Sequence, residues 1–174
     1  FQIFIVHSLF ILIFKRRSPI KFFKGIWPAQ VVAFTTQSSF GTLPVTIESL
    51  ENNIGVSSST ASFVASLGST VGMNGCGGVF PAIVAIFVAN VFGIELTLTH
   101  YILMILTIVV GSVGIAGVPG AATMSTTLIL TTLGLPIEGM AIILGVDAII
   151  DMARTLTNVT GAGLAAYIVD KECK

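Results

Sequence analysis

The apolar character of this chain is interrupted twice in the same way, about 75 residues apart. The first unit opens with Ser38–Pro44 and the second with Gly114–Gly120, and each opening is a Gly/Pro-containing turn in apolar sequence. Further along each unit lies a second interruption, at Gly72–Gly78 and at Asp151–Gly161. Helix-breaking residues at membrane depth are tolerated only where protein or a water-filled cavity satisfies the freed backbone groups. Interrupted segments paired in this way predict the binding site of a membrane transporter.

The composition is that of a membrane protein. Of the 174 residues, 54% are hydrophobic and 9% are charged, and the mean hydropathy is +1.00. These values exclude an ordinary soluble domain, and a net charge of zero offers no basic surface for a nucleic acid partner. The runs apolar enough for bilayer spans or re-entrant segments are Phe1–Phe14, Ala61–Phe92, Tyr101–Val118 and Met140–Ile150. Because the chain starts inside the first run, we expect a fragment whose upstream helices are missing.

The distribution of charge sets the expected topology. Seven of the eight Lys and Arg residues lie in Lys15–Lys24 or in the C-terminal tail, so the positive-inside rule predicts that this loop and the C-terminus are cytoplasmic. We expect residues 1–24 to hold the end of a transmembrane helix and the basic loop. We expect residues 25–174 to form one domain, with hairpin one at 25–53, a broken helix at 60–92, hairpin two at 101–133 and a last helix at 139–169.

The last apolar segment contains a stripe of polar side chains. Asp147, Asp151, Arg154, Thr155 and Asn158 are separated by spacings that place them on one face of a helix. Ionisable groups inside a membrane are costly unless they are paired or face a cavity, so they mark a functional site by default. The alternative is a structural Asp151–Arg154 pair that locks helices together.

The stripe suits an amino acid zwitterion. Asp151 offers a carboxylate to an ammonium group, and Arg154 offers a guanidinium that grips a carboxylate in a bidentate fork. Asn158 and Thr155 can complete the hydrogen bonds. Hydroxyl groups and backbone N–H groups at helix ends, which attract anions, are expected at the two hairpin tips: Ser38, Ser39, Gly117 and Val118.

At these residues the chain resembles the C-terminal half of the dicarboxylate/amino acid:cation symporter family, the glutamate-transporter-like elevator carriers. The resemblance covers about residues 25–170 and is strongest at Ser38–Pro44, Ala116–Gly120 and Asp151–Gly161. It implies an all-α membrane protein, an inverted-repeat elevator transporter whose moving transport domain has two re-entrant helical hairpins and two broken transmembrane helices. It also implies a multi-pass protein of the plasma membrane, embedded in the lipid bilayer, that forms a homotrimer when full length.

The same resemblance assigns roles to residues. It places the contacts with a small amino acid substrate at both hairpin tips and on the last helix, at Ser38, Ser39, Gly117, Val118, Asp151, Thr155 and Asn158. Arg154 would hold a distal carboxylate. It also implies a sodium site built from backbone carbonyls at Thr70, Met73, Ser112, Val113 and Ile115.

Departures from the family pattern alter the expected coupling ion. The usual Asn-Met-Asp-Gly-Thr is Gly72-Met73-Asn74-Gly75-Cys76 here, and the Asp that normally follows the last Asn-Val-Thr-Gly is Ala162. Two sodium sites thereby lose carboxylate ligands, whereas hard cations prefer oxygen ligands with some negative charge. We therefore expect one Na⁺, or H⁺ instead, as the coupling ion, and no cofactor.

The altered break points to a particular substrate. The Gly72–Cys76 sequence, together with the retained Arg154, is similar to the corresponding sequence of bacterial L-cystine uptake symporters within this family. Cystine has a second carboxylate for Arg154 and needs more room than glutamate, which Gly72, Gly77 and Gly78 would supply. On this interpretation Cys76 is a substrate-binding residue; the alternative is a small apolar residue within the helix.

Other functions stay open at this point. Within transport, the alternative is a sodium- or proton-coupled C4-dicarboxylate or glutamate carrier. A membrane fragment that is inactive alone is a further outcome. A membrane enzyme or receptor is a different class, but the sequence offers no Ser/His constellation for catalysis and no Cys/His cluster for a transition metal. We therefore expect that the protein is not an enzyme.

Overall fold

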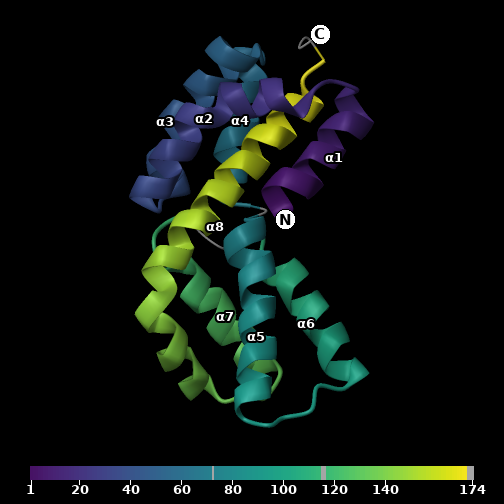
Figure 1. The fold of residues 1–174 in the computed structure, drawn as a ribbon, viewed down its shortest axis with the longest axis vertical. Helices are drawn as coiled ribbons and strands as arrows, with labels where there is room; N and C mark the ends of the chain where they lie inside the picture. The colour runs from purple at the N-terminus through teal and green to yellow at the C-terminus, as the bar shows by residue number, and fades with distance from the viewer. Residues whose placement is uncertain (72, 115–116, 172–174) are drawn as a thin grey trace.

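The structure is a computed structural model and describes residues 1–71, 73–114 and 117–171 (Figure 1). Within these residues the chain forms helices and turns and no strand, which confirms the predicted all-α class. The chain begins with a short apolar helix that combines π-helical and α-helical turns over Gln2–Lys15, with α1 at Ser8–Phe10.

The first helical hairpin pairs α2 (Pro19–Thr36) with α3 (Ser39–Glu48), which pack side by side. The chain reverses at Gln37, whose φ of 55° is left-handed, and the Ser38 side chain then caps α3 by accepting a hydrogen bond from the Gly41 N–H at 3.0 Å. The turn is therefore shorter than the Ser38–Pro44 expected from the sequence, because this cap lets the helix begin at Ser39. At the other end, Pro19 occupies the first turn of α2, so Lys21 and Lys24 lie on a helix rather than in the predicted loop.

The predicted interruption after the first hairpin is present but lies earlier than expected. The chain leaves α3 through a π-helical turn (Ser49–Ile54), and then α4 (Ser58–Gly68) ends before a non-helical stretch that includes Met73. Helix resumes as a π-helical turn, Asn74–Val79, that leads directly into α5 (Phe80–Val91). The glycines after Asn74 are thus helical, because a glycine weakens a helix by only about 1 kcal/mol and does not by itself end one. Gly72 lies outside the described residues.

The second helical hairpin consists of α6 (Leu98–Gly111) and α7 (Ala121–Thr132). Thr97 and His100 form a reciprocal capping box that starts α6. Gly120 precedes α7 with a φ of 80°, a left-handed conformation that favours glycine. These helices occupy the residues expected for the arms of hairpin two.

The last helix, α8 (Met140–Val169), is continuous over 30 residues. This corrects the prediction of two broken transmembrane helices, since only the α4–α5 segment is interrupted. The physical reason is that the glycine and the polar side chains of Asp151–Gly161 weaken a helix but do not by themselves end one. In addition, Thr157 and Thr160 donate their hydroxyl hydrogens to the carbonyls of Ala153 and Leu156, one turn earlier, which is compatible with a continuous helix.

Two separate hydrophobic cores lie on either side of the middle of α8. Figure 1 shows an upper half, made of α1–α4 with the C-terminal half of α8, and a lower half, made of α5–α7 with the N-terminal half of α8. The upper core includes Phe22, Ile26 and Leu50, and the lower core includes Val84 and Leu130. We call the zone between the two halves the waist. The middle of α8, the hairpin tips and the α4–α5 interruption all meet there.

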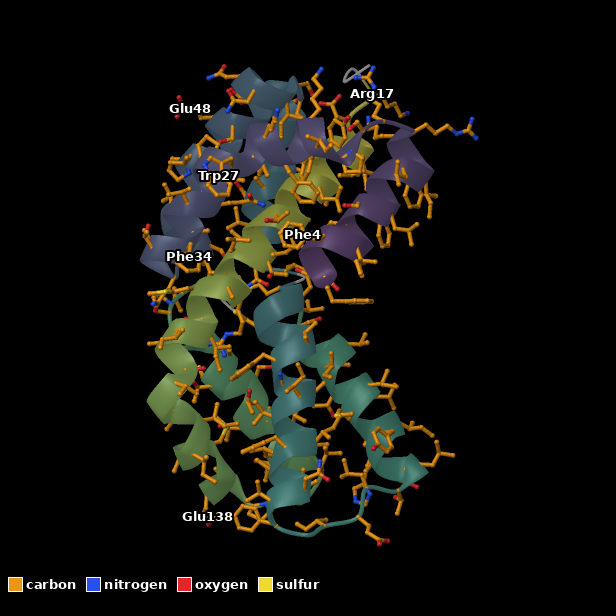
Figure 2. All side chains as sticks on the ribbon, in the orientation of Figure 1. Phe4, Arg17, Trp27, Phe34, Glu48 and Glu138 are labelled. Atoms are coloured by element: carbon orange, nitrogen blue, oxygen red, sulfur yellow. The ribbon has the colours of Figure 1, made fainter. Side chains whose placement is uncertain are left out.

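The outer surface fits a bilayer. Large apolar side chains such as Phe63, Val110 and Ile149 are exposed, and Figure 2 shows Arg17 and Glu48 at one end of the molecule and Glu138 at the other. By length and composition, Asn74–Val91 is the one stretch of the described residues that is long and apolar enough to cross a membrane. The apolar helices Gln2–Lys15 and Leu98–Gly111 are shorter.

Two glycines near the start of α8 give a test of this packing. A Cβ built on Gly139 lies 2.6 Å from Cγ2 of Val88, a stiff side chain, whereas a Cβ on Gly145 meets nothing within 4 Å. We expect Gly139→Ala to lower the stability of the full-length protein by about 1–3 kcal/mol. Gly145→Ala should raise it by about 0.5–1 kcal/mol through helix propensity.

Thermal unfolding of the two variants in detergent, beside the unchanged protein, measures both effects. Equal melting temperatures for the two variants would contradict the packing of α8 against α5.

Candidate functional site

The polar stripe of α8 lies at the waist. Asp151, Arg154, Thr155 and Asn158 are all buried, each at most 5% exposed, and Asp147 is partly buried. They lie between the two apolar cores, where a charged side chain is stable only with partners. The helical spacing seen in the sequence therefore does place these residues together on one buried face.

Arg154 is held by both carboxylates of the stripe. Its Nη1 donates to Oδ1 of Asp147 at 2.7 Å, and its Nε donates to Oδ1 of Asp151 at 3.3 Å. Its Nη2 lies 3.1 Å from the same Asp151 oxygen, an ion-pair distance, but lacks hydrogen-bond geometry and has no hydrogen-bond partner. Both ion pairs are internal to α8, so the Asp151–Arg154 pair does not lock one helix to another. With both carboxylates ionised, the cluster has one negative charge in excess.

The helix that resumes after the interruption packs directly on this stripe. The Gly75 N–H donates to Oδ1 of Asn158 at 2.8 Å, and Nδ2 of Asn158 lies 3.0 Å from Sγ of Cys76. Sγ of Cys76 also lies 3.8 Å from Oδ1 of Asp151. Cys76 is therefore buried among polar groups of the stripe, in addition to its contacts with the lower apolar core.

The tips of the two helical hairpins touch each other. The carbonyl oxygen of Gly117 accepts hydrogen bonds from Oγ of Ser38 and from the Phe40 N–H, both at 3.1 Å. A Cβ on Gly117 would clash with the Ser69 carbonyl oxygen and approach Ser39, so the tip of the second hairpin also packs against the interruption. Val118, by contrast, is about half exposed.

Two spaces adjoin the stripe. A cavity of about 10 Å³ is lined by Ser39, Ser69 and Asn158, among others, and such a volume holds about one water molecule. A second cleft, of about 180 Å³, is lined by Arg154, Phe80 and mainly apolar neighbours. The structure thus brings Ser39 to Asn158 of the stripe and leaves only a water-sized space between them, so the stripe is closed on the side of the hairpin tip.

The residues expected at a sodium site use their side chains locally. Oγ1 of Thr70 donates to the Leu67 carbonyl and Oγ of Ser112 donates to the Val109 carbonyl, so each hydroxyl satisfies a helix end. Met73 is buried and Val113 is exposed, and Ile115 lies outside the described residues. Across the described part of the chain, no three His, Cys, Asp or Glu side chains gather where they could hold a metal ion. A cation here would depend on backbone and amide oxygens.

Sequence reasoning missed one contact of the site. The Phe80 ring faces the guanidinium of Arg154, with Cζ 3.9 Å from the ring centroid. Phe80 follows Cys76 by four residues, the spacing that puts two side chains on the same helix face. That spacing was the available signal, and it was hidden because Gly72–Gly78 was read as non-helical.

Comparison with known proteins identifies the family of this chain. The family model described as the sodium:dicarboxylate symporter family matches residues 1–172. An uncharacterized symporter of Haemophilus influenzae is 41% identical over 97% of this chain, and the L-cystine uptake protein TcyP of Bacillus cereus is 39% identical over the same share. Human excitatory amino acid transporter 2 is 40% identical over 88% of the chain. The chain spans 38%, 36% and 27% of the lengths of these three relatives.

These relatives are named as a symporter, an uptake protein and a transporter. The chain belongs to the sodium:dicarboxylate symporter family. The resemblance noted in the sequence is thereby confirmed.

Gly75 and Gly78 provide a matched test of the contact between the resumed helix and α8. A Cβ on Gly75 would lie 2.7 Å from the backbone oxygen of Arg154, whereas one on Gly78 meets nothing within 4 Å. We expect Gly75→Ala to push this helix off the stripe, which should reduce stability by about 1–3 kcal/mol and abolish most uptake. Gly78→Ala should leave uptake close to that of the unchanged protein.

Uptake by the full-length variants, normalised to the amount of protein in the membrane, measures the difference. Full activity of Gly75→Ala would show that the contact with Asn158 is not required.

Proposed function

We propose that the full-length protein is a secondary-active symporter for an amino acid that bears a second carboxylate, and that its substrate is L-cystine. The observation that supports this most is the buried cluster of Asp151 and Arg154, set on α8 where both hairpin tips and the interruption meet. A buried acid–base pair can neutralise both charges of a zwitterion. Membership of the sodium:dicarboxylate symporter family supports the transport of a solute together with a cation.

The head group of the substrate is assigned to the stripe. Asp151 would take the ammonium group, with Thr155 and Asn158 completing the hydrogen bonds, and Arg154 would take the distal carboxylate. Nη2 of Arg154 supports this role, because it is a buried donor without a hydrogen-bond partner. The backbone and hydroxyl groups of the tips would close over the ligand, at Ser38, Ser39, Gly117 and Val118.

The choice of L-cystine rests on space beside Arg154. The cleft of about 180 Å³ that Arg154 lines offers room beyond the head group, and Gly75 is part of its wall, whereas Gly77 and Gly78 are not. A relative named for L-cystine uptake is 39% identical to this chain. A human relative named as an excitatory amino acid transporter is 40% identical, so identity does not separate the two substrates. A sodium- or proton-coupled glutamate or C4-dicarboxylate carrier is therefore the second candidate.

Movement is assigned to residues 25–174 as a transport domain that shuttles against a scaffold. The helical hairpins would be re-entrant, the first opening from the cytoplasm and the second from outside, with the C-terminus cytoplasmic. Because the relatives are much longer than this chain, the scaffold and the trimer contacts would lie in the remainder of the full-length protein. The chain alone would then bind substrate without completing a transport cycle.

Coupling is proposed to need at most one sodium ion. Ala162 packs close to Gly68, and Asn74 has a buried side-chain oxygen without a hydrogen-bond partner. Neutral residues therefore occupy the two positions where the family pattern has an aspartate. The backbone carbonyls of Thr70, Met73, Ser112 and Val113 could hold one Na⁺ without a carboxylate. The alternative coupling ion is a proton bound at Asp147 or Asp151.

Competition experiments test the proposed substrate. In cells or proteoliposomes that contain the full-length protein, unlabelled L-cystine should suppress the uptake of labelled L-cystine, whereas excess succinate or L-aspartate should suppress it only weakly. The physical reason is that the smaller solutes leave the cleft beside Arg154 empty. Strong competition by succinate with none by cystine would favour the dicarboxylate carrier.

Imposed ion gradients test the proposed coupling. We expect a weak, hyperbolic dependence of uptake on sodium, with about one ion per substrate, or uptake driven by a proton gradient alone, because carboxylate ligands are missing from the sodium positions. Uptake into proteoliposomes with separately imposed sodium and pH gradients measures the sodium-driven and the proton-driven transport. A steep, sigmoidal dependence on sodium would contradict this account of Asn74 and Ala162.

A further inference from the structure

We infer that Phe80 is a positioning residue that holds Arg154 in place to read the distal carboxylate of the substrate; this inference rests on the proposed function. Cζ of Arg154 lies 3.9 Å from the centroid of the Phe80 ring, and the two side chains are 5% and 7% exposed. A guanidinium over an aromatic face is attracted by the ring quadrupole, and the attraction grows when water is excluded.

The contact with Phe80 differs in kind from the ion pairs. Asp147 and Asp151 belong to α8 and move with Arg154. Phe80 is the first residue of α5, on the segment that resumes after the interruption. The ring therefore fixes the guanidinium relative to a second element, and the ion pairs within α8 cannot do this.

The orientation that results leaves one buried donor of the guanidinium without a hydrogen bond. Asp147 and Asp151 accept hydrogen bonds from Nη1 and Nε, whereas Nη2 lies 3.1 Å from Oδ1 of Asp151 as an ion pair and has no hydrogen-bond partner. The cleft of about 180 Å³ beside the guanidinium is lined by Phe80 together with the apolar residues Ile83 and Ile150. An entering carboxylate would satisfy Nη2 in a place with few competing water molecules, where a charge-assisted bond is strong.

The chemistry of the side chain predicts which substitutions preserve the effect. Tyrosine retains the aromatic face, so Phe80→Tyr should keep the guanidinium in place. Leucine and methionine fill much of the volume and remain apolar but have no π-system, so Phe80→Leu and Phe80→Met should release it. The loss should fall on ligands with a distal carboxylate and spare those without one.

The experiment uses full-length protein in proteoliposomes and measures inhibition constants against labelled L-cystine uptake for two competitors. One is unlabelled L-cystine, which has a distal carboxylate, and the other is L-serine, which has only the head group. We expect Phe80→Leu and Phe80→Met to raise the inhibition constant of L-cystine about tenfold, in line with the loss of a desolvated cation–π contact. The inhibition constant of L-serine should change less than about twofold. Phe80→Tyr should stay close to the unchanged protein for both ligands.

A second background separates positioning from packing. In protein that already carries Arg154→Thr, the ring has no guanidinium to hold, so adding Phe80→Leu should not change the ratio of the two inhibition constants further. Equal weakening of cystine and serine by Phe80→Leu, or the same additional loss in the Arg154→Thr background, would overturn the inference and leave Phe80 as core packing.

These results are distinguishable from a failure of the proposed function. If the unchanged protein does not prefer cystine to serine, the proposed function falls and this inference falls with it. If the unchanged protein has the preference and Phe80→Leu and Phe80→Met both retain it, only the role of Phe80 is overturned.

Discussion

The buried guanidinium of Arg154 is the constraint around which the rest of the waist is arranged. A lone cation at this depth would be strongly unfavourable, and two carboxylates from the same helix, Asp147 and Asp151, offset that cost. The cluster retains excess negative charge, and Nη2 of Arg154 has no hydrogen-bond partner. It is therefore suited to receive a zwitterion rather than only to stabilise the fold. The two hydrophobic cores stop on either side of it, and the polar contacts of the waist converge on it.

Features governed by helical periodicity could be predicted from the sequence. The stripe on α8 followed from spacing alone, since positions three and four residues apart share a face whatever lies around them. The hairpin arms α6 and α7 followed from apolar runs bounded by glycine and proline. The family could be recognised because short motifs at both hairpin tips and on the last helix occur together in one order.

Features decided by local competition or by tertiary contact could not be predicted. The side chain of Ser38 caps α3 and shortens the first tip. The last helix, α8, stays continuous although it contains Asn158 and Gly161, because these residues weaken a helix without ending it. The contact between Phe80 and Arg154 joins residues far apart in the chain and depends on helix resuming at Asn74. No sequence pattern in either segment alone predicts the contact between these two side chains.

The contact between the hairpin tips has a kinetic consequence. One acceptor, the carbonyl oxygen of Gly117, receives hydrogen bonds from both Ser38 and Phe40. Withdrawal of either hairpin breaks the same two hydrogen bonds together, so the two bonds form and break as one unit. The two bonds contribute the same amount to the barrier whichever hairpin withdraws. A difference between the two withdrawals would come from other interactions.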